Sequence, residues 1–405
     1  MITPAYSMTA TERVLPRLAL DFTTGVLDPR VTVTRALNTA TAIGSNGYIA
    51  IVNANLPRFD YDPVTLACKG LLIEESRTNS MTYSGDIQSY WGAAFATLSG
   101  FSSTAPDGTA TVCKVLPNTS TNPHGAQKTI STTGQVTFSI YAKSNGYNRL
   151  VIGGNNTNYV YFNLDTGVIE SSLGTNWTAA TVAAAGNGWY RCSATTSTSM
   201  GRFDAFAFNA LQTNGNTAPS FTGNGTSSIL LWGAQLEAGA FATSYIPTTT
   251  TSVTRNADVV SMTGTNFSDW FNPSQGTFVV GLQKISPSSQ AIYGFDVVGA
   301  ASTYSMRVLL GTDARMQSVD NGAVQVDSQL AGSVPTTPAK YAMAYKLNDY
   351  AGAADGAAAV TDTSATVPAL SSLNIGSTIV RNLYMRTIYY YPQRLINNEV
   401  QAFSK

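Results

Sequence analysis

The stretch QVTFSIYAK, from Gln135 to Lys143, alternates apolar and polar side chains with a period of two. Valine, phenylalanine, isoleucine and alanine take every second place, and threonine, serine and tyrosine stand between them. Because successive side chains of a β-strand point to opposite faces, this pattern predicts a strand with one buried face.

Strand signals of this kind recur along the chain and are separated by Gly, Asn, Ser and Thr. In NYVYFNLDTGVIESS we expect two strands joined by a turn at Asp165–Gly167. One short helix is expected from Ile396 to Phe403, with Asn397 or Asn398 as its cap. Many short strands with such turns predict an all-β fold of two jelly-roll or β-sandwich domains preceded by an extended N-terminal arm.

Changes of composition suggest where these parts begin and end. TTTTSVTRNADVVSMTG reads as a low-complexity connector. The predicted parts are an N-terminal arm or attachment segment at 1–78, a jelly roll at 79–247, a linker at 248–264 and a β-sandwich at 265–405. We expect the arm to need the jelly roll, a neighbouring chain or a larger particle to fold on, because its short strands offer little core.

Charge is scarce in this chain. Charged residues make up 11% of the sequence and the formal net charge is +0, whereas soluble domains carry roughly 25% charged residues. The absence of a basic stripe argues against nucleic acid as a partner. No stretch approaches the ~18 apolar residues of a membrane span, so membrane insertion is not expected. There is no signal-peptide pattern near the N-terminus, so we expect release by lysis or within a particle.

Metal and nucleophile chemistry have little support in the sequence. The three cysteines are widely spaced and odd in number, so neither a disulfide framework nor a zinc cluster is indicated, and Cys113 and Cys192 are expected to be buried. A single histidine, His124 in TNPHGAQ, cannot build a multi-histidine metal site and is expected in a loop.

Two adjacent acids, Glu74 and Glu75 in GLLIEESRTN, raise the question of acid/base catalysis. Neighbouring side chains of a strand point apart, so the two carboxylates cannot converge on one glycosidic bond. A structural pairing is favoured, with Arg77 or with an arginine of the arm such as Arg30 or Arg35.

Other acids leave two alternatives open. A hydrolytic pair is conceivable if some of them meet in three dimensions; the candidates are Asp165, Glu170, Asp204, Glu237, Asp258, Asp296 and Asp327. Glu237 is expected to hold a turn or an arginine, with calcium ligation as the alternative. No cofactor is expected, calcium remains a possibility, and the metal question stays open.

A carbohydrate site needs flat rings and side-chain amides, because sugars have apolar C–H faces and polar rims. Such residues gather in NNTNYVYFNLD and in the neighbouring GTNWTAA, where Trp177 is expected in a loop. The candidate glycan-binding residues are Asn155, Asn156, Tyr159, Tyr161 and Trp177. The alternative is that these rings fill the core or a subunit interface, as is expected of Trp189 and Trp232.

Three stretches resemble tailed-phage virion proteins of the fibre, spike and minor tail protein kind. They are LDFTTGVLDPRVTVTRA with NLPRFDYDPVTLACKGLLIEESRTN, WGAQLEAGAFATSYIPT, and VTRNADVVSMTG. The resemblance implies a carbohydrate-binding jelly roll in the middle. NIGSTIVRNLYMRTIYYYPQRLINNEVQAF is similar to the end of a concanavalin/laminin-G-type sandwich. The resemblance also implies a location on the virion surface and other virion proteins as partners. It further implies an oligomer, with a trimer favoured.

These observations predict a structural virion protein in a fibre, spike or tail-tip appendage that adheres to host-surface glycan without being an enzyme. Two alternatives remain. One is an architectural capsid or tail decoration or connector protein without a glycan site. The other is a glycan depolymerase, against which the sparse acids and lone histidine argue.

Overall fold

The computed structural model describes residues 15–37, 39–154, 157–171, 173, 175–209, 219–287, 290–301, 303–335, 337–376 and 382–405. These residues form an all-β protein whose strands pair antiparallel, which confirms the predicted fold class. The stretch quoted first becomes β12 (Val136–Asn145), a ten-residue strand.

The chain divides into two compact units. The terminal unit comprises Met1–Thr32, Val260–Ile375 and Leu383–Lys405, and the central unit comprises Val33–Val259 and Gly376–Asn382. Residues expected as a linker include β21 (Val253–Arg255) and β22 (Val259–Thr263). The domain boundaries predicted from composition remain predictions, since a compact unit need not fold alone.

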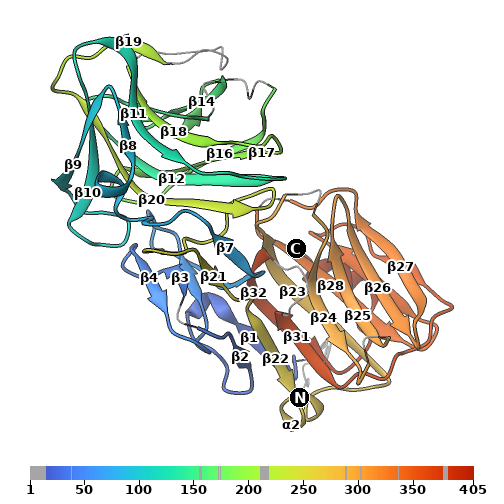
Figure 1. Cartoon of the computed structure of the whole chain (residues 1–405). Coiled ribbons are helices and arrows are strands. Elements are labelled where there is room, and N and C mark those ends of the chain that lie inside the picture. Colours follow the sequence, from blue (N-terminus) through green and yellow to red (C-terminus); the bar gives the residue numbers. More distant parts are fainter. Residues whose placement is uncertain are drawn as a thin grey trace, which may run out of the picture. The chain divides into compact units, whose positions relative to one another are not determined.

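Two sheets make up most of the central unit (Figure 1). The first, in spatial order, is β16 (Trp177–Ala184), β17 (Trp189–Thr196), β12, β20 (Ser228–Ala238), β10 (Thr111–Pro117) and β9 (Ala96–Ser102). The second is β15 (Val168–Ile169), β14 (Thr157–Asn163), β13 (Arg149–Gly154), β18 (Arg202–Phe208), β11 (Thr121–Thr129) and β19 (Ser220–Thr222), with β8 (Gly92–Ala94) also paired to β11. Between β14 and β15 lies the expected turn, with Gly167 at φ 66.

The core of the central unit is built from the inward faces of these sheets. Phe138 and Ile140 of β12 are fully buried, as the alternation predicted. The expectation of a single buried face is wrong, because Thr137, Ser139 and Tyr141 on the other face are buried too, and Tyr141 packs in a second apolar cluster. Trp189 and Trp232 are 1% and 4% exposed, which confirms them as core residues. Cys113 and Cys192 are buried free thiols, and burial raises the pKa of both, that of Cys113 to about 12.

Short strands precede and follow the two large sheets of the central unit. Their bounds are β2 (Thr32–Thr34), β3 (Ala40–Ile43), β4 (Ile49–Val52), β5 (Phe59–Tyr61), β6 (Cys68–Glu74) and β7 (Arg77–Asn79), with α1 (Ile87–Tyr90) after them. β3 pairs β4, β5 pairs β6, and β7 pairs β21.

A buried cluster of charges ties these short strands to the connector. Glu74 contacts Arg58 at 2.7 Å and Arg255 at 2.9 Å. Asp258 pairs with Arg35 at 2.9 Å and also with Arg58. All five side chains are at most 2% exposed. Because an unpaired buried charge is costly, each member depends on the others.

The two adjacent glutamates are therefore structural, as expected. Burial alone would raise the pKa of Glu74, but Arg255 and Arg58 outweigh it and lower this pKa to about 2. Glu75 faces elsewhere and accepts a 2.7 Å hydrogen bond from Nε of Arg77. Of the arm arginines, Arg35 pairs with Asp258 and Arg30 with Asp28.

The terminal unit also has two sheets (Figure 1). One holds β30 (Val360–Asp362), β29 (Tyr350–Ala354), β28 (Ala339–Lys346), β23 (Gln275–Lys284) and β32 (Asn382–Tyr391), with β1 (Leu18–Asp21) paired to β32. The other holds β22, β31 (Ser372–Gly376), β24 (Ile292–Val298), β25 (Ser305–Leu310), β26 (Ala314–Asp320) and β27 (Ala323–Ala331). The unit also contains a 3-10 turn, η1 (Phe22–Thr24), the one-turn helix α2 (Thr265–Ser268) and the helix α3 (Asn397–Phe403).

The predicted C-terminal helix is present as α3 (Asn397–Phe403). Its cap position is Ile396 rather than Asn397 or Asn398, and the N–H of Ile396 donates to Oε2 of Glu399 at 3.2 Å. Val400 is fully buried in an apolar cluster with Leu395. Within the described ranges, no helix has the length and apolar character needed to cross a membrane.

Candidate functional site

Two glycines shape the outer face of the sheet that carries β14, β13, β18 and β11. A Cβ on Gly153 would lie 2.2 Å from the ring of Tyr159, and one on Gly125 would lie 2.3 Å from Cδ1 of Phe206. Only glycine therefore lets these two rings lie directly against the backbone. The rings form an apolar floor, and both are almost fully buried.

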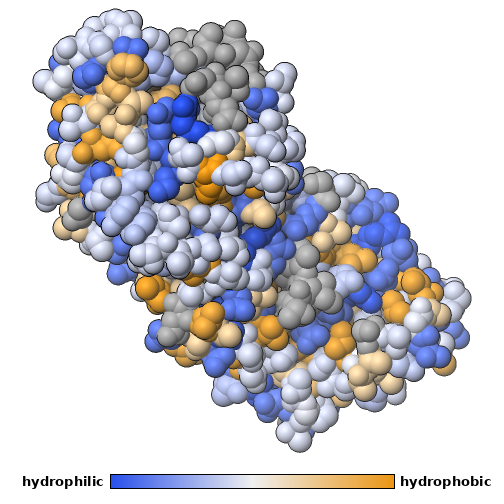
Figure 2. All heavy atoms as spheres, viewed as in Figure 1, coloured by the Kyte–Doolittle hydropathy of each residue, from blue (hydrophilic) through white to orange (hydrophobic). Residues whose placement is uncertain are grey.

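Above this floor the surface is hollowed into a cavity of about 600 Å³. Strands β8, β11, β14 and β18 contribute to its wall. The lining residues are Ala93, Ala94, Phe95, Pro123, Gln127, Tyr159, Arg202 and Phe206. Apolar side chains gather over β8 and β11 on the face of this unit that Figure 2 shows. The cavity has one strongly exposed ring, that of Phe95 at 51%.

Phe95 is placed by the path of the backbone. It is the single residue between β8 of one sheet and β9 of the other, so the chain changes sheet within one residue. Its φ of 43 lies in the left-handed region, which costs a non-glycine residue about 1–2 kcal/mol. The carbonyl oxygen of Phe95 accepts a 3.0 Å hydrogen bond from the N–H of Asn118. The strained turn is thus held by the neighbouring structure.

The lone histidine also supports this turn. His124 was expected in a loop, but it lies in β11 and is fully buried. Its Nδ1 lies 2.6 Å from the carbonyl oxygen of Phe95, and its Nε2 lies 2.9 Å from that of Phe221. Strand pairing, rather than the turn-like residues around it, decides the position of this side chain.

Charge in the cavity wall is paired. Nε of Arg202 donates to Oδ1 of Asp204 at 2.6 Å, and a second guanidinium nitrogen donates to Oδ2 at 3.1 Å. The amide of Gln127 donates to Oδ1 of Asp204 at 3.1 Å. The hydrogen bonding of Arg202 to the carboxylate of Asp204 raises the pKa of Arg202. Burial, helped by the charge of Asp204, raises the pKa of Tyr159 to about 12.

The predicted glycan-binding residues lie in different places. Tyr159 lines the cavity, and Tyr161 shares its strand face but is fully buried, with its ring 5.7 Å from that of Phe208. Trp177 was expected in a loop, yet it begins β16 in the other sheet and is 3% exposed. Asn155 and Asn156 lie outside the described residues. The glycan role of these five residues remains a prediction, and burial leaves the rings of Tyr159, Tyr161 and Trp177 little surface for a ligand.

Sequence reasoning missed Phe95, Gln127 and Arg202 as a group. Phe95 stands in GAAFATLSG, where no alternation marks it as exposed. Gln127 and Asp204 are opposite one another in the β11–β18 register, and Arg202 is two residues from Asp204 on the same strand face. The strand pairing of β11 with β18 would have been needed to find them.

Most acids considered for hydrolysis have partners elsewhere. Glu170 pairs with Arg149, and Asp327 pairs with Arg315. Glu237 accepts hydrogen bonds from the backbone N–H and the hydroxyl of Thr243, which confirms its expected role at a turn. Among the described residues, no group of three or more His, Cys, Asp or Glu side chains could hold a metal ion. The expectation of no cofactor, with calcium as the alternative, stays a prediction.

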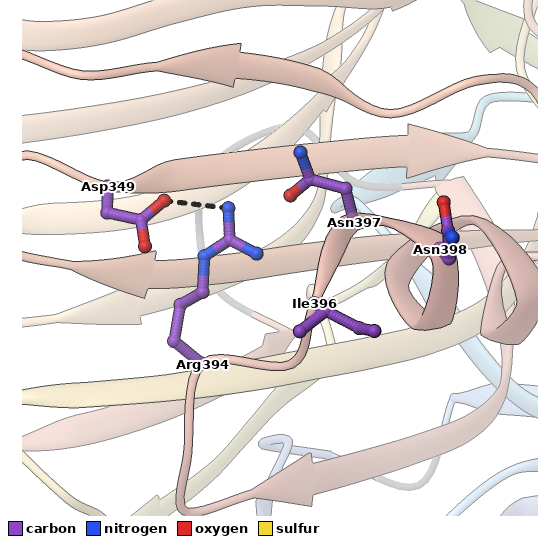
Figure 3. Close-up of a pocket in the computed structure, with 5 residues that line it drawn as sticks. All are labelled: Asp349, Arg394, Ile396, Asn397 and Asn398. Atoms are coloured by element: carbon purple, nitrogen blue, oxygen red, sulfur yellow. Dashed lines mark ion pairs between the residues drawn. The ribbon is translucent and has the colours of Figure 1, made fainter.

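A second hollow lies in the terminal unit beside the start of α3 (Figure 3). It has a volume of about 420 Å³ and is lined by Asp349, Arg394, Ile396, Asn397 and Asn398. Arg394 and Asp349 face each other and form a 2.8 Å ion pair, as Figure 3 shows. The hollow has polar groups but no aromatic ring among its lining residues.

Comparison with known proteins shows similarity of fold alone. No family model and no curated protein matches the sequence. A CBM40 module of a Ruminococcus gnavus sialidase is 12% identical and has a TM-score of 0.28, covering 33% of this chain and 83% of the module. The CBM2 module of an evolved Dit protein from Lactobacillus casei BL23 phage J-1 is 12% identical, with a TM-score of 0.24 and coverages of 33% and 69%.

Domains LG4-5 of the mouse laminin α1 chain are 9% identical, with a TM-score of 0.25, and cover 69% of this chain and 88% of that one. All three TM-scores are low, so these similarities carry no argument about function. The function has to be argued from the site itself.

Proposed function

We propose that the central unit binds carbohydrate in the cavity on its β8–β11–β18–β14 face. The observation that carries this proposal is the exposed ring of Phe95 beside the polar side chains of Gln127 and Arg202. A flat ring can stack on the apolar C–H face of a sugar, and polar groups at its edge can fix the sugar's orientation. A cavity of about 600 Å³ is of the size that ligand sites have.

The backbone at Phe95 adds support. A left-handed backbone conformation costs energy in a bulky residue, so it persists only where surrounding contacts hold it. Strain of this kind is concentrated at functional sites. The hydrogen bonds to the Phe95 carbonyl do maintain it, although the ring itself gains little burial. A backbone that is already held in place loses little conformational freedom when its exposed ring binds a ligand.

A glycan array with purified protein tests this proposal. Phe95→Ala should weaken binding about tenfold or more, whereas Phe95→Trp, which keeps a ring, should retain it. Val168→Ala is the matched control, because Val168 is also 51% exposed and lies in β15 of the same sheet. Binding by Phe95→Ala equal to that of wild type would remove this site from consideration.

We propose further that the protein is a structural component of a tailed-phage virion, in a fibre, spike or tail-tip appendage on the virion surface. The sequence resemblance and the neutral, charge-poor composition support this role. Antibody labelling of virions should decorate one structure on the particle. Unlabelled, intact particles would contradict the proposal, and labelled particles without glycan binding would favour an architectural decoration or connector protein.

An oligomer, with a trimer favoured, belongs to the same proposal, with other virion proteins as partners. Subunits with few charges can approach without strong repulsion. Sedimentation of the full chain at micromolar concentration should show an oligomer. A monomer both in solution and in the density on the virion would contradict this.

We propose adhesion without hydrolysis. The carboxylate beneath the cavity, Asp204, is held by Arg202 and Gln127. Incubation with host polysaccharide should release no reducing ends. If wild type releases reducing ends and Asp204→Asn does not, the protein is a depolymerase and the proposal of adhesion without hydrolysis is wrong.

A further inference from the structure

We propose that this cavity selects uncharged sugars, and that Asp204 sets the selectivity by neutralising Arg202. The inference rests on the proposed carbohydrate site and concerns the class of ligand it takes. It follows from the arrangement of charge in the cavity wall.

The ion pair is asymmetric in its exposure. The side chain of Arg202 is 26% exposed and lines the cavity, whereas that of Asp204 is fully buried beneath it. Two guanidinium nitrogens of Arg202 donate to the two carboxylate oxygens. A ligand therefore meets a guanidinium whose positive charge is already balanced from below.

The position of Asp204 is fixed from several sides. It stands opposite Gln127 in the β11–β18 register and opposite Gly153 in the β13–β18 register. The Gln127 amide donates to Oδ1, the oxygen that also accepts from Nε of Arg202. If Asp204 turned away from Arg202, its buried carboxylate would lose the positive charge that compensates it, which is costly.

Among the lining residues that the structure describes, none besides Arg202 carries a positive charge. The residues of β8 are glycine and two alanines. Tyr159 has a pKa raised to about 12 and is neutral near pH 7. Lys128, the residue after Gln127, directs Nζ to the carbonyl oxygen of Tyr90 at 3.1 Å.

An acidic sugar would meet two obstacles here. Its carboxylate or sulfate would have to share a guanidinium that Asp204 already engages, and it would approach the buried charge of Asp204 itself. An uncharged sugar needs only hydrogen bonds and the ring of Phe95. The same residues thus favour one class of ligand and reject the other.

Matched oligosaccharides test the inference. One is built from a neutral hexose and the other from the corresponding uronic acid, so the two differ only in the oxidation of C6. Wild type should bind the neutral form at least tenfold more tightly, with little dependence on salt. A wild type that prefers the uronic acid would overturn the inference while leaving the carbohydrate site intact.

Asp204→Asn is the decisive variant, because it keeps the shape and removes the charge. Arg202 then presents a net positive charge, so affinity for the uronic acid should rise at least tenfold and fall again as salt is added. An unchanged ratio in a folded Asp204→Asn protein would overturn the inference.

The double variant Arg202→Gln/Asp204→Asn provides a second test if the single variant Asp204→Asn does not fold. It contains no charge at this pair, so it should not gain the salt-dependent affinity for the uronic acid that is expected of Asp204→Asn. A folded double variant that binds the uronic acid tightly at low salt would contradict the inference. If wild type binds neither oligosaccharide nor any array glycan, the proposed function itself fails, which is a different result from a reversed preference.

Discussion

Two of the hollows, the cavity beside Phe95 and the one beside the start of α3, share an arginine–aspartate pair and differ in almost everything around it. In the central unit, Asp204 is fully buried and Arg202 is 26% exposed. In the terminal unit the exposure is reversed, with Asp349 48% exposed and Arg394 9% exposed (Figure 3). Phe95 stands beside the first pair and Ile396 beside the second.

This difference shows why an ion pair alone does not make a binding site. A carboxylate that faces water is solvated and screened, so its pairing contributes little to stability or to selectivity. A buried carboxylate holds its partner in one geometry and fixes the local charge. The ring adds what neither pair supplies, a surface for the apolar face of a sugar.

In the buried charge cluster of the central unit, both partners of each ion pair are buried. Mutation there is expected to have the largest effect on stability. Glu74→Gln should lower the free energy of unfolding by about 3–5 kcal/mol, because Arg58 and Arg255 lose their shared partner. Glu75→Gln is the adjacent control and should cost less, since Glu75 pairs with Arg77 nearer the surface. Urea unfolding measures both, and equal losses would show that burial does not govern the strength of these pairs.

Acid should remove the same stabilisation in wild type. The folded pKa of Glu74 is lowered from 4.5 to about 2, so its contribution is complete above about pH 5 and is lost as the pH falls towards 2. The difference corresponds to about 3 kcal/mol. Urea unfolding between pH 7 and pH 3 should show stability falling more steeply with acid in wild type than in Glu74→Gln. Parallel curves for the two proteins would contradict the assignment to Glu74.

Phe95→Gly separates binding from stability at the cavity. Glycine adopts positive φ readily, so the variant relieves strain and should melt at the same temperature or slightly higher. Loss of the ring should weaken carbohydrate binding about tenfold or more. A much lower melting temperature would show that the ring packs as core and that its exposure is not functional.

How much the sequence can predict depends on the separation of the interacting residues. The alternation around Phe138 predicted β12 because the period of a strand is local. Arg58 and Asp258 are 200 residues apart, and no local pattern links them. Phe95 is exposed because the chain changes sheet there, which follows from strand pairing. Tyr159, predicted to bind glycan, lies at the cavity with its ring in the floor rather than at the exposed surface, and its glycan role remains a prediction.

The smallest expected effect belongs to the exposed pair in the terminal unit. Asp349→Ala removes a partner that is 48% exposed, so Arg394 can turn its charge to water, and its guanidinium also donates to the carbonyl oxygen of Leu395 at 2.5 Å. Exposed pairs contribute about 0–1 kcal/mol, and salt reduces this further. Urea unfolding of Asp349→Ala should therefore lie within about 1 kcal/mol of wild type, and carbohydrate binding should be unchanged. A larger loss of stability would mean that this pair is protected from water in the assembled protein, and a loss of binding would shift the carbohydrate site to the terminal unit. Agreement with the small value would show that the exposed pair contributes little, as expected from the exposure of the Asp349 carboxylate.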